Sequence, residues 1–422
     1  MQKRQKSVAI IGAGAAGLMA ADRLSQSCPD LVIKIYDAMP SPARKFLMAG
    51  KSGLNISHQS GISDPEGFAA RYGKASDWMR PMLQAFGTPD ILRWMESLGQ
   101  EYFVGSSNRI FPKAMKASPL LRALMKRLES RGVTLAPRHR WIGWREDGQM
   151  LFATAQGERS IAADACLLSL GGPSWPRLGT DGAFLPVLAE RGVSCHPYRP
   201  ANCGFTIRLP ESFDTNWAGE PLQSVGLSFA DQAVHGGFVL SLRAGESHQE
   251  ASWSIEGGAI YALSARLRDA IENEGSATLS IDLRPNISME QIKERLNRPR
   301  GKQSLSNHLR RSLKLQGVQA ALLKALTDKH VMNDIDQLAT AIKALPITLT
   351  SPRPIAEAIS TAGGVALEEL NENMMVRRMP GLFMAGEMLD WEAPTGGYLL
   401  TGCLSQGHRA ALGMASYLET LG

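Results

Sequence analysis

The stretch Val8–Gly17, with the sequence VAIIGAGAAG, determines the class of this fold. Its first four residues are apolar and predict a buried strand, and the run Ala15–Ser27 has the apolar spacing of a helix. Gly12 permits a tight turn, Gly14 lets a ligand approach the backbone, and Gly17 lets the helix pack on the strand. The free N–H groups at the start of such a helix bind phosphate well. The stretch therefore predicts a Rossmann-type site for the pyrophosphate of a dinucleotide.

Asp37 follows the second predicted strand, Leu31–Tyr36, and lies twenty residues after Gly17. At this position of a βαβ unit, a carboxylate can accept a hydrogen bond from a ribose hydroxyl. A glycine-rich motif alone would also fit an ordinary turn. Here the motif follows a strand, opens a helix and is followed by an acidic residue at the right spacing, so we predict dinucleotide binding.

The composition is that of a folded globular protein with more than one domain. The chain has 422 residues, of which 44% are hydrophobic and 20% charged, and a single core rarely grows beyond about 300 residues. No apolar run reaches the roughly 18 residues of a membrane helix, so we expect a soluble protein without a membrane partner, and the odd number of cysteines fits a reducing cytoplasm best. The five cysteines form no CxxC pair and no metal-ligand spacing, which argues against a metal site and against the disulfide-reductase flavoenzymes.

The order of predicted elements indicates a discontinuous nucleotide-binding domain in an α/β protein. Rossmann character returns near the C-terminus, where a strand over Leu382–Ala385 leads into Gly386 and a helix begins near Gly397. Short strands and then helices occupy the middle of the chain. We predict three domains: a Rossmann domain over 1–190 and 346–422, an inserted β-rich domain over 191–286, and a small helical domain over 287–345.

The C-terminal segment favours FAD over NAD as the dinucleotide. Nicotinamide dehydrogenases with a Rossmann domain usually have its two halves contiguous in sequence. Here the strand that completes the domain, Leu382–Ala385, lies near the C-terminus. Glu387, directly after Gly386, can hold the ribityl chain of FAD. The helix that begins near Gly397 can stabilise negative charge on the flavin ring when the ring is reduced.

Segments distributed along nearly the whole chain resemble the aminoacetone-oxidase-like family of bacterial FAD-binding Rossmann flavoproteins. The resemblance implies a three-layer FAD domain, an inserted β-barrel-like domain and a small helical domain. It does not assign a substrate. The segments that carry it are Val8–Ala21, Arg44–Asn55, Asn108–Pro112, Ser169–Pro176, Thr361–Val365, Gly381–Asp390 and Thr395–Tyr398.

By position, the resemblance implies that Arg44 and Lys45 approach the FAD phosphates or ribose and that Trp141 touches the adenine through its backbone. The alternative is that Arg44 and Lys45 are an exposed basic pair after a strand and have no role in cofactor binding. The backbone at Gly171 and Gly172 would form a close crossing near the cofactor. The glycine pairs 363–364 and 396–397 would approach the isoalloxazine together with Tyr398. The full set of expected FAD-binding residues is Gly12, Gly14, Ala15, Ala16, Gly17, Asp37, Ala38, Arg44, Lys45, Gly50, Asn55, Trp141, Gly171, Gly172, Gly386, Glu387, Gly396, Gly397 and Tyr398.

No residue stands out as the catalytic acid or base. None of the eight histidines belongs to a nucleophile or metal motif. The resemblance implies that Gly50–Asn55 lies alongside the cofactor, and His58 is the candidate proton donor only because it closes this segment. We predict an FAD-dependent oxidoreductase that exchanges a hydride with a small organic substrate, with NAD(P)H or oxygen as a transient redox partner. The alternative within enzymes is an NAD(P)H-dependent reductase of an activated carbon–carbon double bond.

Positive charge is concentrated between Ser288 and His330. This segment contains ten basic and three acidic residues, and the formal net charge of the whole chain is +6. An RNA-associated flavoprotein that uses this segment is therefore an alternative of another class. The segment contains no aromatic residue on which bases could stack, and its leucines have the spacing of an amphipathic helix packed on a core. We expect a solvated helical face and no specific nucleic-acid partner.

Overall fold

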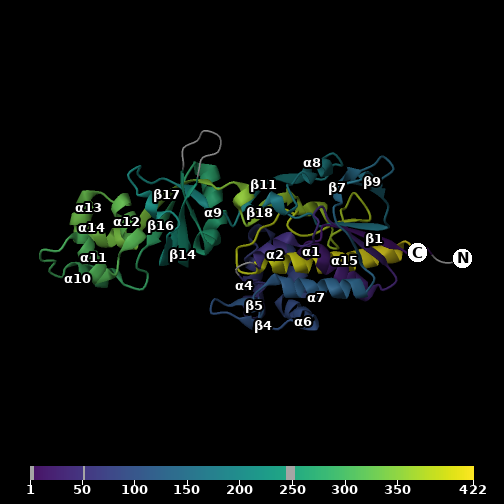
Figure 1. Cartoon of the computed structure of the whole chain (residues 1–422), viewed down its shortest axis with the longest axis horizontal. Coiled ribbons are helices and arrows are strands. Elements are labelled where there is room, and N and C mark those ends of the chain that lie inside the picture. Colours follow the sequence, from purple (N-terminus) through teal and green to yellow (C-terminus); the bar gives the residue numbers. More distant parts are fainter. Residues whose placement is uncertain (1–3, 51–52, 244–251) are drawn as a thin grey trace. The chain divides into compact units, whose positions relative to one another are not determined.

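The computed structural model describes residues 4–50, 53–243 and 252–422, and its elements are labelled in Figure 1. Contacts divide the chain into two compact units, residues 1–199 with 359–422 and residues 200–358. This division differs from the three predicted domains in placing 191–199 with the first unit and 346–358 with the second. The finer division of the second unit into a β-rich and a helical domain stays a prediction.

A five-stranded parallel sheet forms the centre of the first unit. Its strand order is β19-β10-β1-β2-β6, so the C-terminal strand lies at one edge and closes the sheet that the N-terminal βαβ unit begins. The central strands are buried on both faces, as expected of a parallel sheet covered by helices. The strands are β1 Ser7–Ile11, β2 Val32–Tyr36, β6 Thr134–Ala136, β10 Ala165–Leu168 and β19 Leu382–Met384.

Helices α1 (Ala15–Ser27) and α15 (Tyr398–Thr420) lie side by side along this sheet, although they come from opposite ends of the chain (Figure 1). Gly407 makes the close crossing possible, because a Cβ atom there would overlap with the backbone of Ala16. The predicted Rossmann domain built from both chain ends is therefore confirmed as a fold.

Two small antiparallel sheets and one strand pair complete the β structure of the first unit. The sheets are β7 Arg140–Trp144 with β8 Met150–Thr154 and β9 Gly157–Ile161, and β3 Ser57–His58 with β5 Arg109–Pro112 and β4 Tyr102–Val104; β11 Cys195–Ala201 pairs with β18 Ser360–Val365. The further helices are α2 Arg44–Ala49, α3 Ser60–Ser63, α4 Pro65–Ala70, α5 Ser76–Ala85, α6 Thr88–Ser97, α7 Ala117–Ser130 and α8 Phe184–Ala189.

The second unit is a closed six-stranded barrel with helices around a separate hydrophobic core, which confirms the predicted barrel-like insertion. The barrel order is β12-β15-β14-β13-β16-β17. Its strands are β12 Phe205–Ile207, β13 Pro221–Phe229, β14 Gln232–Arg243, β15 Ser252–Glu256, β16 Ala277–Asp282 and β17 Leu345–Pro352. Its helices are α9 Gly258–Glu274, α10 Met289–Leu296, α11 Leu305–Leu313, α12 Gly317–Leu326, α13 Lys329–Asn333 and α14 Ile335–Lys343.

Helix α11 is amphipathic, as its leucine spacing predicts. Leu309 and Leu313 are buried in the core of the second unit, whereas Arg310 and Arg311 are exposed. Within the described residues, no helix is long and apolar enough to cross a membrane.

A buried carboxylate holds three helices of the first unit together. Asp22 on α1 is 4% exposed and accepts hydrogen bonds from Trp94 Nε1 on α6 at 2.8 Å and from Arg131 after α7 at 2.9 Å, while Arg127 lies 3.3 Å away. The sequence analysis did not identify this residue, because an acidic residue inside a helix usually faces solvent.

We expect Asp22→Ala to lower the free energy of unfolding of the first unit by about 1–3 kcal/mol, because it leaves the buried Trp94 N–H without its acceptor and two partly exposed arginines without their partner. The measurement is denaturant unfolding followed by tryptophan fluorescence. Arg4→Ala is the control: it removes an exposed ion pair with Asp164, which should contribute less than about 1 kcal/mol. Equal losses in the two variants would contradict the assignment.

Candidate cofactor site

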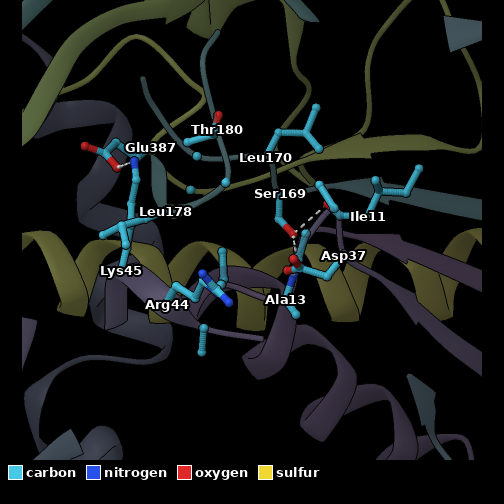
Figure 2. A pocket seen from close by; sticks show the side chains of 18 of the residues that line it. Ile11, Ala13, Asp37, Arg44, Lys45, Ser169, Leu170, Leu178, Thr180 and Glu387 are labelled. Atoms are coloured by element: carbon cyan, nitrogen blue, oxygen red, sulfur yellow. Dashed lines mark hydrogen bonds and ion pairs between the residues drawn. The ribbon is translucent and has the colours of Figure 1, made fainter. Parts of the chain in front are cut away.

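One cavity of about 380 Å³ opens where β1, β2, β10 and β19 end, and all of its lining residues belong to the first unit. Ligands of open parallel sheets bind beyond the carboxyl ends of the strands, and this volume lies within the usual range for small-molecule sites. Figure 2 shows side chains that surround the cavity, among them Ile11, Asp37, Ser169 and Glu387.

The glycine motif has the geometry that its sequence predicts. A Cβ atom on Gly12 would overlap with the carbonyl oxygen of Ser169, and one on Gly17 would overlap with that of Gly12. Gly12 also has a φ of 104°, which disfavours any other residue. A Cβ on Gly14 would meet no atom within 4 Å, although Gly14 lines the cavity. Gly12 and Gly17 therefore serve packing, whereas the space beside Gly14 is open to the cavity, and the approach of a ligand there stays a prediction.

The start of helix α1 suits a phosphate group. Its N-cap residue Gly14 has no side chain to satisfy the first N–H groups, and the first turn carries no acidic residue. Ala15 and Ala16 of that turn line the cavity. Unpaired N–H groups and the helix dipole favour an anion at such an end, so these residues fit the pyrophosphate of a dinucleotide.

Asp37 organises the backbone around the cavity mouth. One carboxylate oxygen accepts the N–H of Ala13 at 2.9 Å and the other accepts the N–H of Met39 at 2.8 Å. Burial raises the pKa of Asp37, and the two backbone hydrogen bonds and Arg44 oppose this increase. Each carboxylate oxygen can accept a further hydrogen bond, so the predicted ribose contact is compatible with this geometry and stays a prediction.

Lys45 and Glu387 form an ion pair on the opposite side of the cavity (Figure 2). Lys45 Nζ lies 3.6 Å from Glu387 Oε2, donates to the carbonyl of Gly172 and lies 3.2 Å from Ser174 Oγ. Glu387 is 8% exposed and accepts the N–H of Thr361 at 3.0 Å. Within the described residues, the Lys45 ammonium is therefore engaged by protein groups, and its expected approach to the phosphates stays a prediction.

The expected residue set divides into two groups in the structure. Those that line the cavity are Gly12, Gly14, Ala15, Ala16, Asp37, Ala38, Arg44, Lys45, Trp141, Gly171, Gly386 and Glu387. Those outside its lining are Gly17, Gly50, Asn55, Gly172, Gly396, Gly397, Tyr398 and the proton-donor candidate His58. Lys51 and Ser52, within the segment expected beside the cofactor, lie outside the described residues. Contact of the first group with FAD stays a prediction.

The glycine pair before α15 packs against protein rather than lining the cavity. Gly397 has a φ of 92°, and a Cβ there would lie 2.6 Å from the backbone nitrogen of Ser57. The Tyr398 ring stacks on His58, with 5.4 Å between centroids. His58 Nδ1 in turn lies 2.8 Å from Ser60 Oγ. The first turn of α15 still reaches the cavity through Leu399 and Leu400.

The sequence analysis missed a substantial part of the cavity wall. Signals were present for some of these residues: the predicted strand around Trp141, the apolar face of α15 for its first two turns, and the resemblance over Ser169–Pro176 for Ser169 and Leu170. The stretch from Leu178 to Val187 carried none. The residues missed are Ile11, Ala13, Tyr36, Ser41, Ala43, Phe46, Ala49, His139, Arg140, Ile142, Ser169, Leu170, Leu178, Gly179, Thr180, Asp181, Ala183, Phe184, Val187, Ile359, Leu399, Leu400 and Cys403.

The fold and this cavity define a class of protein, the Rossmann-type FAD-binding flavoproteins. A family model described as "HI0933-like protein Rossmann domain" matches residues 6–413, so the chain belongs to that family. This finding confirms the family resemblance of the sequence, and the protein is an FAD-dependent oxidoreductase.

Relatives from several bacteria match nearly the whole chain. A 3-dehydro-bile acid delta(4,6)-reductase of Clostridium scindens is 23% identical over 96% of this chain and 97% of the relative. A ribosomal RNA dihydrouridine synthase of Escherichia coli is 22% identical over 92% of this chain and 93% of the relative.

Solved structures share the fold. The quinol fumarate reductase FrdA of E. coli has a TM-score of 0.53 at 16% identity, covering 100% of this chain and 72% of that one. A 3-ketosteroid delta1-dehydrogenase of Sterolibacterium denitrificans has a TM-score of 0.52 at 12% identity, covering 97% and 100%.

We expect Gly14→Val to abolish FAD retention without unfolding the protein, because the new side chain would occupy the open space at the helix start. Gly258→Val is the matched control, since its Cβ would also meet no atom within 4 Å but the residue lies in the second unit. Cofactor content after desalting and the thermal unfolding temperature are the two measurements. Retention of FAD by Gly14→Val would show that the pyrophosphate does not bind there.

Proposed function

We propose that this enzyme reduces a carbon–carbon double bond conjugated to a carbonyl group, with hydride supplied by reduced FAD. The observation that carries the proposal is one reaction common to the names of the two relatives described above: a bile-acid delta(4,6)-reductase and a dihydrouridine synthase each add hydrogen across such a bond. Carbonyl conjugation matters because it delocalises the negative charge that forms when hydride adds to the β-carbon. The activated-double-bond alternative of the sequence analysis thus becomes the preferred one.

The residues of the cavity fit this role. The N–H groups at the start of α1 would hold the pyrophosphate, and Glu387 would accept hydrogen bonds from ribityl hydroxyls. The first turn of α15 lacks acidic residues and its N-cap has no side chain. This helix end would therefore favour negative charge next to it. When bound, FAD supplies two-electron hydride chemistry.

A nicotinamide cofactor is the proposed reductant, and it would bind transiently. The sequence contains one GxGxxG motif after a strand and no second one that could hold a resident nicotinamide. We also propose that the protein works in the reducing cytoplasm, because all five cysteines are free thiols.

We expect NADH or NADPH to bleach the flavin without oxygen, and an α,β-unsaturated ketone or a uridine compound then to restore its oxidised spectrum. The measurement is anaerobic absorbance with product analysis for the saturated compound. The Gly14→Val variant, which should lack the cofactor, is the control for reactions in free solution. A flavin that only oxygen reoxidises, across a panel of such alkenes, would contradict the proposal and favour an oxidase.

A second candidate function is reduction of uridine within RNA, and a basic hollow in the second unit favours it. The hollow has a volume of about 590 Å³ and is lined by cations and primary amides alone, which are Gln303, Asn307, Arg310, Arg311, Lys314 and Gln316. The three cations are exposed, and none of them pairs with an acidic residue within the described part of the chain. Arginine, lysine and amide side chains are the usual partners of phosphate and sugar.

The absence of apolar side chains from the hollow argues for a nucleic acid over other anionic partners. A protein partner would usually need an apolar anchor at the centre of the interface, and a membrane surface would need an exposed apolar helix face. Leu309 and Leu313 of α11 are instead buried in the core of the second unit. Recognition without stacking residues would rest on the RNA backbone, so it would be strongly salt-dependent.

For this second candidate, we expect the triple change Arg310→Gln, Arg311→Gln, Lys314→Gln to lower the log–log salt slope of RNA binding by about 2, at roughly 0.7 per lost phosphate contact. The probe is a uridine-containing RNA hairpin, measured by fluorescence anisotropy between low and physiological salt. Lys324→Gln with Lys329→Gln is the control, since both lysines are exposed outside the hollow. Equal slopes in all three proteins would leave the solvated helical face of the sequence analysis as the better description.

A further inference from the structure

A histidine–aspartate pair lies in the first unit, outside the lining of the cavity. His196 Nδ1, on β11, is 2.6 Å from Asp390 Oδ2. The other oxygen of Asp390 accepts the N–H of Gly363 at 2.9 Å. The side chains are 55% and 31% exposed. Asp390 therefore orients one nitrogen of the ring, and Nε2 on the other edge makes no hydrogen bond within the described residues.

Strand β18 places this pair close to the cavity wall. The N–H of Thr361 donates to Glu387, which lines the cavity, and the N–H of Gly363 donates to Asp390. Residues two apart on a strand present their N–H groups on the same edge, about 7 Å apart. Glu387 and Asp390 are therefore neighbours along one edge of β18. The pair of His196 and Asp390 is bound two residues further along the strand than Glu387.

The other histidines offer less as proton donors. His139 lines the cavity, but beside Tyr36 and Trp141, at the end expected to hold the adenine. His58 lies outside the lining, as His196 does, but its Nδ1 contacts a serine hydroxyl rather than a carboxylate that could stabilise an imidazolium. His408 is buried against Phe86, and burial lowers its pKa to about 4, which keeps it neutral. His330 is the other described histidine near a carboxylate, at 4.0 Å from the exposed Asp328 in the second unit.

We infer that His196 is the proton donor of the double-bond reduction, with Asp390 as its positioning residue; the inference rests on the proposed function. Reduction needs a hydride at the β-carbon, which reduced flavin supplies, and a proton at the α-carbon. The His196 imidazolium gives its Nε2 proton to the α-carbon as the substrate enolate returns to the carbonyl form. The new C–H bond forms, the N–H bond breaks, and His196 becomes neutral and takes its next proton from water.

Asp390 contributes by fixing which nitrogen keeps its proton. Its contact with Nδ1 favours the neutral tautomer with hydrogen on Nδ1, so Nε2 is the nitrogen that releases and recaptures the proton. The N–H of Gly363 holds the carboxylate in place for this contact. Asparagine at this position would keep the size but lose the charge that stabilises the imidazolium.

The test separates proton transfer to carbon from electron transfer. Holoenzyme is reduced without oxygen, then mixed in a stopped-flow instrument either with an α,β-unsaturated ketone or with oxygen. We expect His196→Gln to slow reoxidation by the ketone about 100-fold or more, the usual effect of a lost general acid, and to leave reoxidation by oxygen unchanged. His235→Gln, an exposed histidine on β14, is the matched control and should behave as wild type. Reoxidation of His196→Gln by the ketone at the wild-type rate would overturn the inference.

A second measurement does not depend on activity. Nitrogen-15 NMR of imidazole-labelled protein reports the tautomer of each histidine, and His196 is assigned from the signal lost in His196→Gln. We expect hydrogen on Nδ1 of neutral His196 in wild type and loss of this preference in Asp390→Asn. An unchanged tautomer in Asp390→Asn would refute the positioning role. If no alkene reoxidises the wild-type flavin, the proposed function fails, and the inferred proton transfer fails with it even where NMR supports the pair.

Discussion

The close contact between the β1–α1 turn and the loop after β10 is the constraint on which the rest of the first unit depends. Ser169 Oγ donates to the carbonyl of Gly12 at 2.7 Å and lies 3.1 Å from that of Ile11, while the Ser169 backbone occupies the space that a Cβ on Gly12 would need. This contact sets the spacing between the first helix and the end of β10. Because the helix start and Gly171 both line the cavity, any side chain at position 12 would displace its two walls relative to each other.

Strand β18 connects the cofactor cavity with the proposed chemistry. Its alternate N–H groups hold Glu387 and Asp390, two carboxylates from the loop that follows β19. Glu387 is buried and paired with Lys45, whereas Asp390 is partly exposed and holds His196. One strand edge thus gives two similar side chains different environments. The buried one suits a fixed cofactor contact, and the exposed one suits a group that exchanges protons with water.

Local patterns predicted the nucleotide-binding elements closely. The predicted helix Ala15–Ser27 has those same bounds in the structure, and the strand expected over Val8–Ile11 is one residue longer. Both succeed because backbone geometry and burial there follow the spacing of neighbouring residues. The pair Gly396 and Gly397 shows the limit of such patterns. A glycine is needed wherever something approaches the backbone, and the sequence does not reveal that Ser57 rather than a ligand lies close to Gly397.

By itself, the sequence predicted the Rossmann fold and the glycine turn before the first helix, since both rest on residues close together in the chain. The family resemblance added the inserted barrel, and the C-terminal segment favoured FAD as the cofactor. Only the tertiary structure decided how Lys45 meets Glu387, how His196 meets Asp390, and which residues after β10 form the cavity wall. Those partners lie hundreds of residues apart in the chain. Their contacts are created by sheet order and strand register, and no spacing between neighbouring residues encodes them.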